Sequence, residues 1–140
     1  MEKSFHHLLL LAQTAFQKQV VLEAAAQGLL PGQSKMLDFL AEHDGCEQKV
    51  LGQKFHLEPA TVTGILKRME ESGLICRQLM EGNKKSRYVY LTEKGKRLAL
   101  ETVRPIFSAC EAKALEGLSG EEQEFLREML EKIYENMMKG

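Results

Sequence analysis

The spacing of apolar residues changes from helical to alternating directly after Gly73. Across residues 59–72 the apolar side chains recur every three or four positions, as in an amphipathic helix. Residues 74–79 and 86–91 instead alternate like β-strands, and a polar segment with a Gly-Asn pair separates the two runs. The sequence therefore predicts a helix followed at once by a β-hairpin with a basic tip.

Two shorter helices are predicted ahead of this unit. Pro31 suits the first turn of one helix. The buried stripe of that helix would consist of Met36, Leu37 and Leu40. Residues 48–55 form a second, short helix, and a turn over residues 57–59 leads into the helix at 59–72. This order of elements is that of a winged helix-turn-helix, so the predicted fold class is mainly α with a small β-hairpin wing.

The helix at 59–72 has the surface expected of a DNA-recognition helix. Its apolar stripe consists of Val62, Ile65, Leu66 and Met69. The opposite face carries Ala60, Gly64, Lys67 and Glu71, and its flanks carry Thr61, Thr63 and Arg68. Small residues allow a close approach to the major groove, and hydroxyl and cationic groups can bond base edges or phosphates. Any amphipathic surface helix is polar opposite its stripe, so DNA contact is a hypothesis that the basic hairpin strengthens.

Charge is segregated along the chain. The whole sequence is nearly neutral, with 19 basic and 20 acidic side chains. Residues 47–97 nevertheless carry 11 basic and 6 acidic side chains, a net charge of +5, between two acidic ends. A basic middle segment suggests a nucleic-acid-binding face, because it attracts the phosphate backbone.

The ends of the chain predict three further helices. Residues 2–27 form one long helix, and Pro105 kinks or divides the helix that follows the hairpin. A capping box at residues 119–122 begins the last helix. Long apolar stripes over residues 5–22 and 125–137 favour terminal helices that form an intertwined dimerisation domain. The alternative is an ordinary bundle packed on its own winged helix.

Four short segments together resemble the MarR family of bacterial transcription regulators. They read Leu-Pro-x-Gln at 30–33, Leu-x-Pro-Ala-Thr-Val-Thr at 57–63, Lys-Arg-Met-Glu-x-x-Gly-Leu-Ile at 67–75 and Leu-Thr-Glu-Lys-Gly at 91–95. Each segment is short, and the resemblance lies in their order and spacing. The family's long flanking helices account for the rest of the chain.

The resemblance implies a homodimer that binds double-stranded DNA. Residues 1–29 and 98–140 would form the helical dimerisation region, and residues 30–97 the winged helix-turn-helix. The two winged helices would reach successive major grooves of a pseudo-palindromic operator. The resemblance further implies a cytoplasmic repressor. A small aromatic or phenolic effector would release it from DNA by binding in a cleft bordered by Phe16 and Met36.

Two places depart from the family pattern. Gly64 stands where the family commonly has an arginine, so we expect one base or phosphate contact to be missing. The wing, which also carries Arg87, has Asn83, Lys84 and Lys85 where the family usually has Asp-Arg-Arg. Lysine keeps the charge but lacks the planar fork that fits a narrow minor groove. We therefore expect the wing to attract the DNA backbone and to read sequence poorly.

The sequence argues against catalysis and metal binding. No Ser-His-Asp set, phosphate-binding glycine loop or pair of buried carboxylates can be assembled, so we expect no enzyme activity and no cofactor. His6-His7 and the cluster at 43–46 lack the repeated spacing of metal ligands. Cys46, Cys76 and Cys110 are too few for a disulfide scaffold and are expected to be reduced, buried thiols.

Two functional classes remain. The first is a ligand-responsive, DNA-binding regulator, and the second is a winged-helix protein-interaction module whose basic face is incidental. Salt separates them, because counterion release makes DNA affinity fall steeply with ionic strength. A membrane span or an export signal is not expected, since the apolar runs are short and no signal-peptide pattern is present.

Overall fold

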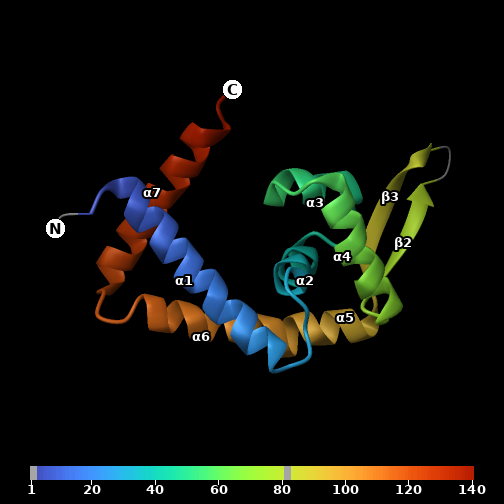
Figure 1. Cartoon of the computed structure of the whole chain (residues 1–140), viewed down its shortest axis with the longest axis horizontal. Helices are drawn as coiled ribbons and strands as arrows, with labels where there is room; N and C mark the ends of the chain where they lie inside the picture. Colours follow the sequence, from blue (N-terminus) through green and yellow to red (C-terminus); the bar gives the residue numbers. More distant parts are fainter. Residues whose placement is uncertain (1–2, 81–82) are drawn as a thin grey trace.

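The computed structural model describes residues 3–80 and 83–140, without the side chains of residues 80–86. It confirms a mainly helical fold with one small antiparallel sheet (Figure 1). The first half contains α1 (Phe5–Ala25), α2 (Gln33–Glu42), β1 (Cys46–Glu47), α3 (Gln48–Phe55) and α4 (Pro59–Glu71). The wing follows as β2 (Ile75–Met80) and β3 (Asn83–Leu91). The chain continues with α5 (Glu93–Leu98), the π-helical turn η1 (Ala99–Val103), α6 (Arg104–Ala114) and α7 (Gly120–Met138).

Local hydrogen bonds explain where two of the helices begin. The Thr92 hydroxyl accepts from the Gly95 N–H over 3.0 Å at the start of α5. The predicted capping box of α7 is confirmed, because Ser119 and Glu122 each accept from the other's backbone N–H. The prediction that Pro31 begins a helix was wrong. The chain first turns through a glycine at residue 32 with a φ of 89°, and α2 begins only after it.

The three strands lie in the order β1-β3-β2, and both pairings are antiparallel. The hairpin was predicted, but its second strand is longer than expected, since β3 already begins at Asn83. A shift in the β2–β3 register between Leu79 and Met80 accommodates the additional residues of β3. The sequence did not predict β1, since two residues show no periodicity. Directly before β1, the Gly45 N–H donates to the Val89 carbonyl over 2.8 Å. The Leu91 N–H donates to the Asp44 carboxylate over 2.7 Å, which fixes the same edge.

One apolar core joins the helix-turn-helix to the sheet and to η1. Its fully buried members include Met36, Leu37, Leu40, Leu51, Val62, Leu66, Met69, Val89 and Val103. The predicted stripes of α2 and α4 therefore face the core, with Ile65 half-buried at the edge. Burial of each such side chain contributes about 1.5–3 kcal/mol relative to exposure. The core thus fixes which face of α4 is turned to solvent.

The helix after the wing is irregular just before Pro105, but it does not divide into two separate helices there. Proline lacks an N–H and its ring clashes with the carbonyl four residues earlier in a regular α-helix. The wider turn of η1 lies directly before it and accommodates this misfit. As a result α5, η1 and α6 run on without interruption beneath the molecule and connect the wing to the terminal helices (Figure 1).

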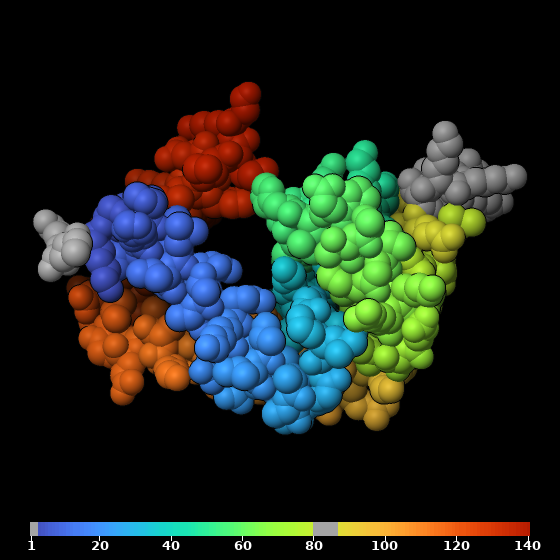
Figure 2. Space-filling model, in the orientation of Figure 1, coloured from blue at the N-terminus to red at the C-terminus, as the bar shows by residue number. Residues whose placement is uncertain are grey.

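The terminal helices α1, α6 and α7 lie at one end of the molecule, and the winged helix lies at the other (Figure 1). In the space-filling view most of α7 stands apart from the winged helix (Figure 2). The Lys54 Nζ of α3 nevertheless donates to the Tyr134 hydroxyl of α7 over 3.2 Å. Among the described residues, no helix has the length and apolar character needed to cross a membrane.

Large apolar side chains of α1 and α7 remain exposed in the single chain. On α1 they are Phe5, Leu8, Leu9, Leu10, Leu11 and Leu22. On α7 they are Phe125, Leu126, Leu130, Tyr134, Met137 and Met138. All residues of α7 are described, and none of them is fully buried. Many exposed large apolar side chains on two helices are typical of an interface with another protein chain.

Candidate nucleic-acid interface

Helix α4 presents to solvent all the residues that the sequence placed on its outer face. These residues are Ala60, Thr61, Thr63, Gly64, Lys67, Arg68 and Glu71. On the opposite face Val62, Leu66 and Met69 are at most 1% exposed. An added Cβ at Gly64 would meet nothing within 4 Å, so packing within this chain does not require a glycine there. The exposed face is therefore small and polar, and internal packing does not explain its glycine.

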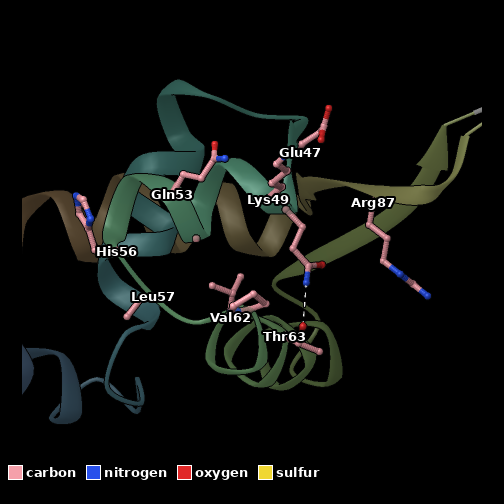
Figure 3. Close-up of a pocket in the computed structure, with 11 residues that line it drawn as sticks. Glu47, Lys49, Gln53, His56, Leu57, Val62, Thr63 and Arg87 are labelled. Atoms are coloured by element: carbon pink, nitrogen blue, oxygen red, sulfur yellow. Dashed lines mark hydrogen bonds between the residues drawn. The ribbon is translucent and has the colours of Figure 1, made fainter. Parts of the chain in front are cut away.

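A hollow of about 680 Å³ lies between α3, α4 and β3 (Figure 3). Its polar lining includes Glu47, Gln48, Lys49, Gln53, His56, Thr63 and Arg87. Lys49 of α3 and Arg87 of β3 are both exposed, and they place positive charge on two sides of the hollow. This arrangement suits an anionic polymer that follows α4.

The wing carries the remaining predicted contacts. Arg87 is exposed on β3 and projects from that strand at one end of the hollow (Figure 3). Asn83, Lys84 and Lys85 belong to β3, but their side chains lie outside the described residues. Their contact with DNA stays a prediction from the sequence.

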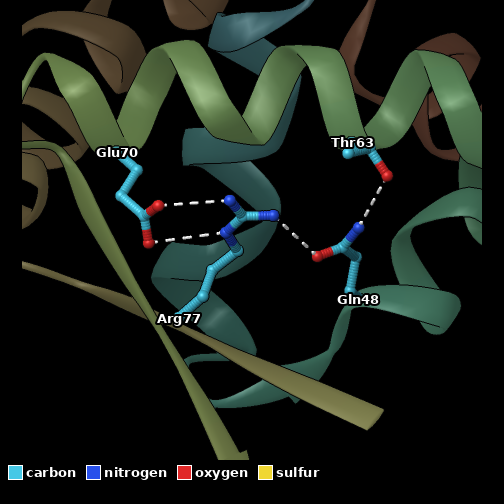
Figure 4. A network of polar contacts seen from close by, with 4 residues as sticks. All are labelled: Gln48, Thr63, Glu70 and Arg77. Carbon is cyan, nitrogen blue, oxygen red and sulfur yellow. Dashed lines mark hydrogen bonds and ion pairs between the residues drawn. The ribbon is translucent and has the colours of Figure 1, made fainter. Parts of the chain in front are cut away.

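A polar network of Thr63, Gln48, Arg77 and Glu70 connects α4, α3 and β2 (Figure 4). The Nε and Nη2 of Arg77 donate to the two carboxylate oxygens of Glu70 over 3.4 and 3.1 Å. The Nη1 of Arg77 donates to Oε1 of Gln48 over 3.3 Å. The Nε2 of Gln48 in turn donates to Oγ1 of Thr63 over 3.1 Å. Because Thr63 and Glu70 lie about two turns apart on α4, the network holds one helix face at two points.

In the ion pair of this network, the side chain of Arg77 is more deeply buried than that of Glu70. Its side chain is 10% exposed, whereas that of Glu70 is 41% exposed. Hydrogen bonds from Arg77 hold the pKa of Glu70 below its ordinary value. The carboxylate therefore stays ionised at neutral pH and holds the guanidinium in place.

Gln48, Glu70 and Arg77 were not predicted as site residues, because polar residues that lie far apart in the chain produce no periodic signal. One signal could have revealed Arg77. The alternation of β2 puts it on the same face as Ile75, which is buried. An arginine on the inward face of a strand needs acceptor partners, and the nearby helix was the place to look for them.

The structure gives Met36 no surface for an effector. Met36 is 0% exposed in the core, and Phe16 is half-buried on α1. A hollow between α1, α2 and α6 has a volume of about 10 Å³, which is close to the minimum for one water molecule. The role of Phe16 in an effector cleft stays a prediction.

The thiols and the histidines offer little reactive chemistry. Cys110 is buried, and Cys46 and Cys76 are half-buried. Burial raises the pKa of the Cys46 and Cys110 thiols, which lowers the fraction of reactive thiolate at neutral pH. Within residues 3–80 and 83–140, no group of three or more His, Cys, Asp or Glu side chains is placed to hold a metal ion.

A winged helix that exposes a small, polar and partly basic recognition helix defines the class of DNA-binding transcriptional regulators. Comparisons with known proteins give the same class. Residues 29–86 match the MarR family. Transcriptional regulator HosA from Escherichia coli O111:H- is 30% identical over 131 residues, which cover 94% of this chain and 94% of HosA.

Two crystal structures illustrate the similarity in fold. A MarR-family transcriptional regulator from Listeria monocytogenes, complexed with a 26-mer DNA, is 26% identical with a TM-score of 0.86, over 98% of this chain and 90% of that chain. CouR from Rhodococcus jostii RHA1, bound to p-coumaroyl-CoA, is 22% identical with a TM-score of 0.82, over 94% and 91% of the two chains.

The chain belongs to the MarR family. It is a winged-helix transcriptional regulator and not an enzyme, as the resemblance of its short motifs indicated.

Proposed function

We propose that two copies of this regulator bind a pseudo-palindromic operator, with one α4 in each of two successive major grooves. The main support is the outer face of α4, which is exposed along its length, whereas the apolar stripe of the same helix is buried in the core. The DNA complex of the Listeria regulator supports this use of the fold. Residues 30–97 would form the DNA-binding domain.

The exposed residues divide by the part of DNA that they would meet. Thr63 and Lys67 lie on α4 where base edges would come close, because Ala60 and Gly64 leave room beside them. Arg68, Arg87, Lys84 and Lys85, together with Thr61 and Asn83, would meet phosphates and sugars along the flanks. Sequence preference would then come mainly from α4.

The dimer in this proposal is supported by the exposed apolar residues of α1 and α7. Residues 1–29 and 98–140 would interlock with the same residues of a second copy, which would remove this surface from water. The interlocked helices would hold the two recognition helices about 34 Å apart, one turn of B-DNA. Dimerisation would therefore determine DNA geometry.

We further propose that the regulator represses transcription and that a small effector releases it from DNA. The support is the p-coumaroyl-CoA complex of CouR, which has the same fold and an aromatic ligand. An effector can release DNA only if it binds more tightly to the conformation that fits the operator poorly. The protein would act in the cytoplasm, where its operator is accessible. Titration of phenolic acids and their coenzyme A thioesters against a preformed DNA complex tests this part.

Selection of bound sequences from random duplexes, followed by titration at several salt concentrations, tests the DNA-binding part. We expect an enriched inverted repeat and an affinity that falls by orders of magnitude between about 50 and 200 mM salt. The absence of duplex binding at low salt would instead favour the protein-interaction module.

A further inference from the structure

We infer that Gln48 keeps the hydroxyl proton of Thr63 free, so that the recognition helix offers a hydrogen-bond donor to the base at that position. The inference rests on the proposed function, because it concerns how α4 would read a major groove. It makes Gln48 a positioning residue for sequence specificity, although it lies on α3 and not on the recognition helix.

The direction of the network begins with Arg77. A guanidinium can only donate hydrogen bonds. Glu70 accepts from its Nε and Nη2, and this two-point contact leaves Nη1 directed at Gln48. The amide of Gln48 must therefore turn its oxygen toward Arg77. The opposite orientation of the amide is excluded, because an –NH₂ group facing Arg77 would leave two donors opposed.

The orientation of the Gln48 amide determines the state of the Thr63 hydroxyl. With its oxygen on Arg77, Gln48 presents Nε2 to Thr63 and donates to Oγ1 over 3.1 Å. A hydroxyl has one proton to donate and two lone pairs that accept. Accepting from Gln48 occupies one lone pair and leaves the proton free. Among the described residues, no acceptor shares the Thr63 hydroxyl proton, and Thr63 is exposed. The proton is thus available to DNA.

A free donor discriminates between bases in the major groove. Guanine, adenine and thymine each present an acceptor there, whereas cytosine presents its N4 amino group, a donor. The free proton therefore lets the wild-type chain bond guanine or thymine, which present only acceptors in the major groove, at the base that Thr63 contacts. Thr63 acts on this base directly, and Gln48 acts through Thr63.

Gln48→Glu reverses the direction while keeping the shape. A glutamate at this position would accept from Arg77 and from Thr63, so the hydroxyl proton would point inward and the outer lone pair would face DNA. The variant should then gain preference for cytosine or adenine, whose amino groups donate in the major groove, by about three- to tenfold relative to the wild type. The glutamate also weakens overall binding through its charge.

Two further variants isolate this effect. Gln53→Glu places the same charge on α3 and in the same hollow but outside the polar network, so it should weaken binding to all sequences equally. Thr63→Val removes the hydroxyl and keeps the shape. In the Thr63→Val background, Gln48→Glu should no longer change the preferred base.

The experiment is selection from duplexes randomised within the half-site, carried out with the full-length wild type and each variant, with circular dichroism to confirm folding. A preference that shifts toward donor bases in Gln48→Glu alone supports the inference. An equal loss on all bases, or the same shift in Gln53→Glu, overturns it. A wild type that enriches no sequence refutes the proposed function itself, which is a distinct result.

Discussion

A Cβ placed on Gly95 would lie 2.0 Å from the carbonyl oxygen of Leu74. The contact joins the start of α5 to the beginning of the wing, where Thr92 also donates its hydroxyl to the Gly73 carbonyl over 2.6 Å. Backbone atoms form the obstacle, so no side-chain rotation can relieve it. This close approach explains why the segment at 91–95 ends in glycine.

Gly95→Ala should destabilise the fold for this reason. Alanine favours helices by about 1 kcal/mol over glycine, yet we expect a net loss of about 1–3 kcal/mol because the wing and α5 must move apart. Gly120→Ala, at the open start of α7, is the matched control and should leave stability nearly unchanged. Urea denaturation of both variants measures the difference. Equal stabilities would show that the contact relaxes without cost.

Gly64→Ala should separate stability from DNA binding. The residue is exposed within α4 and a Cβ there meets nothing, so alanine should stabilise the helix by about 0.5–1 kcal/mol. The same methyl group would occupy the space into which we expect the groove to come. Thermal denaturation should therefore show a gain, and titration with a selected operator a loss. A variant that gained stability and kept its full affinity would show that no close approach occurs at this residue.

The sequence predicted the parts of the fold that rest on periodicity and on local caps. The stripe of α4, the hairpin and the capping box of α7 each have signals within a few residues. The start of α2 could not be placed, because the left-handed turn at residue 32 competes with the proline signal at residue 31. Strand β1 depends on pairing with residues about forty positions away, for which a single sequence gives no signal.

The candidate site divides in the same way. The exposed residues of α4 follow from the position of its stripe, so rotation about the helix axis was sufficient to find them. The connection from Thr63 to Arg77 needs three elements brought together by the core, and no pattern along the chain encodes it. Met36 was correctly predicted in the buried stripe of α2, and its complete burial leaves no surface for the second role given to it, at the border of an effector cleft.

Protonation of Glu70 should weaken the fold at low pH. Its pKa is lowered in the folded state by hydrogen bonds from Arg77, so this contribution to stability is present above the unfolded pKa and is lost as the pH falls through the folded pKa. The free energy of unfolding should thus decrease between about pH 5 and pH 3, by less than about 1 kcal/mol from this group because Glu70 is 41% exposed.

Glu70→Gln tests this assignment when its stability is followed over the same pH range. The variant should be less stable than the wild type at pH 7 and should show a weaker acid dependence. Glu71→Gln removes the same charge one residue further on, at an exposed position outside the polar network. A Glu70→Gln profile identical to that of Glu71→Gln would mean that the pairing with Arg77 contributes nothing to acid sensitivity.

The two basic elements of the interface should differ in their response to salt. Lys84→Ala combined with Lys85→Ala should weaken binding to all duplexes and reduce the salt slope by about one to two, because these residues would meet phosphates. Lys67→Ala, on α4, should instead change the preference among sequences by about 1–3 kcal/mol for a good base contact. Titrations of operator and scrambled duplex at several salt concentrations distinguish the two. The reverse pattern would exchange the roles assigned to wing and helix.

Removal of the chain from Ser119 onward should abolish dimerisation and specific DNA binding together. The truncation deletes α7, whose exposed apolar residues have no cover within the described part of the single chain, and leaves the winged helix intact. Without the second copy, the two recognition helices lose the spacing of about 34 Å that successive grooves require. Because the truncation also removes the hydrogen bond from Lys54 to Tyr134, Tyr134→Phe is the matched control and should stay dimeric and bind operator. Sedimentation velocity and operator titration of both variants test the coupling. A folded monomer that bound the full inverted repeat with undiminished affinity would show that α7 does not set the geometry of recognition.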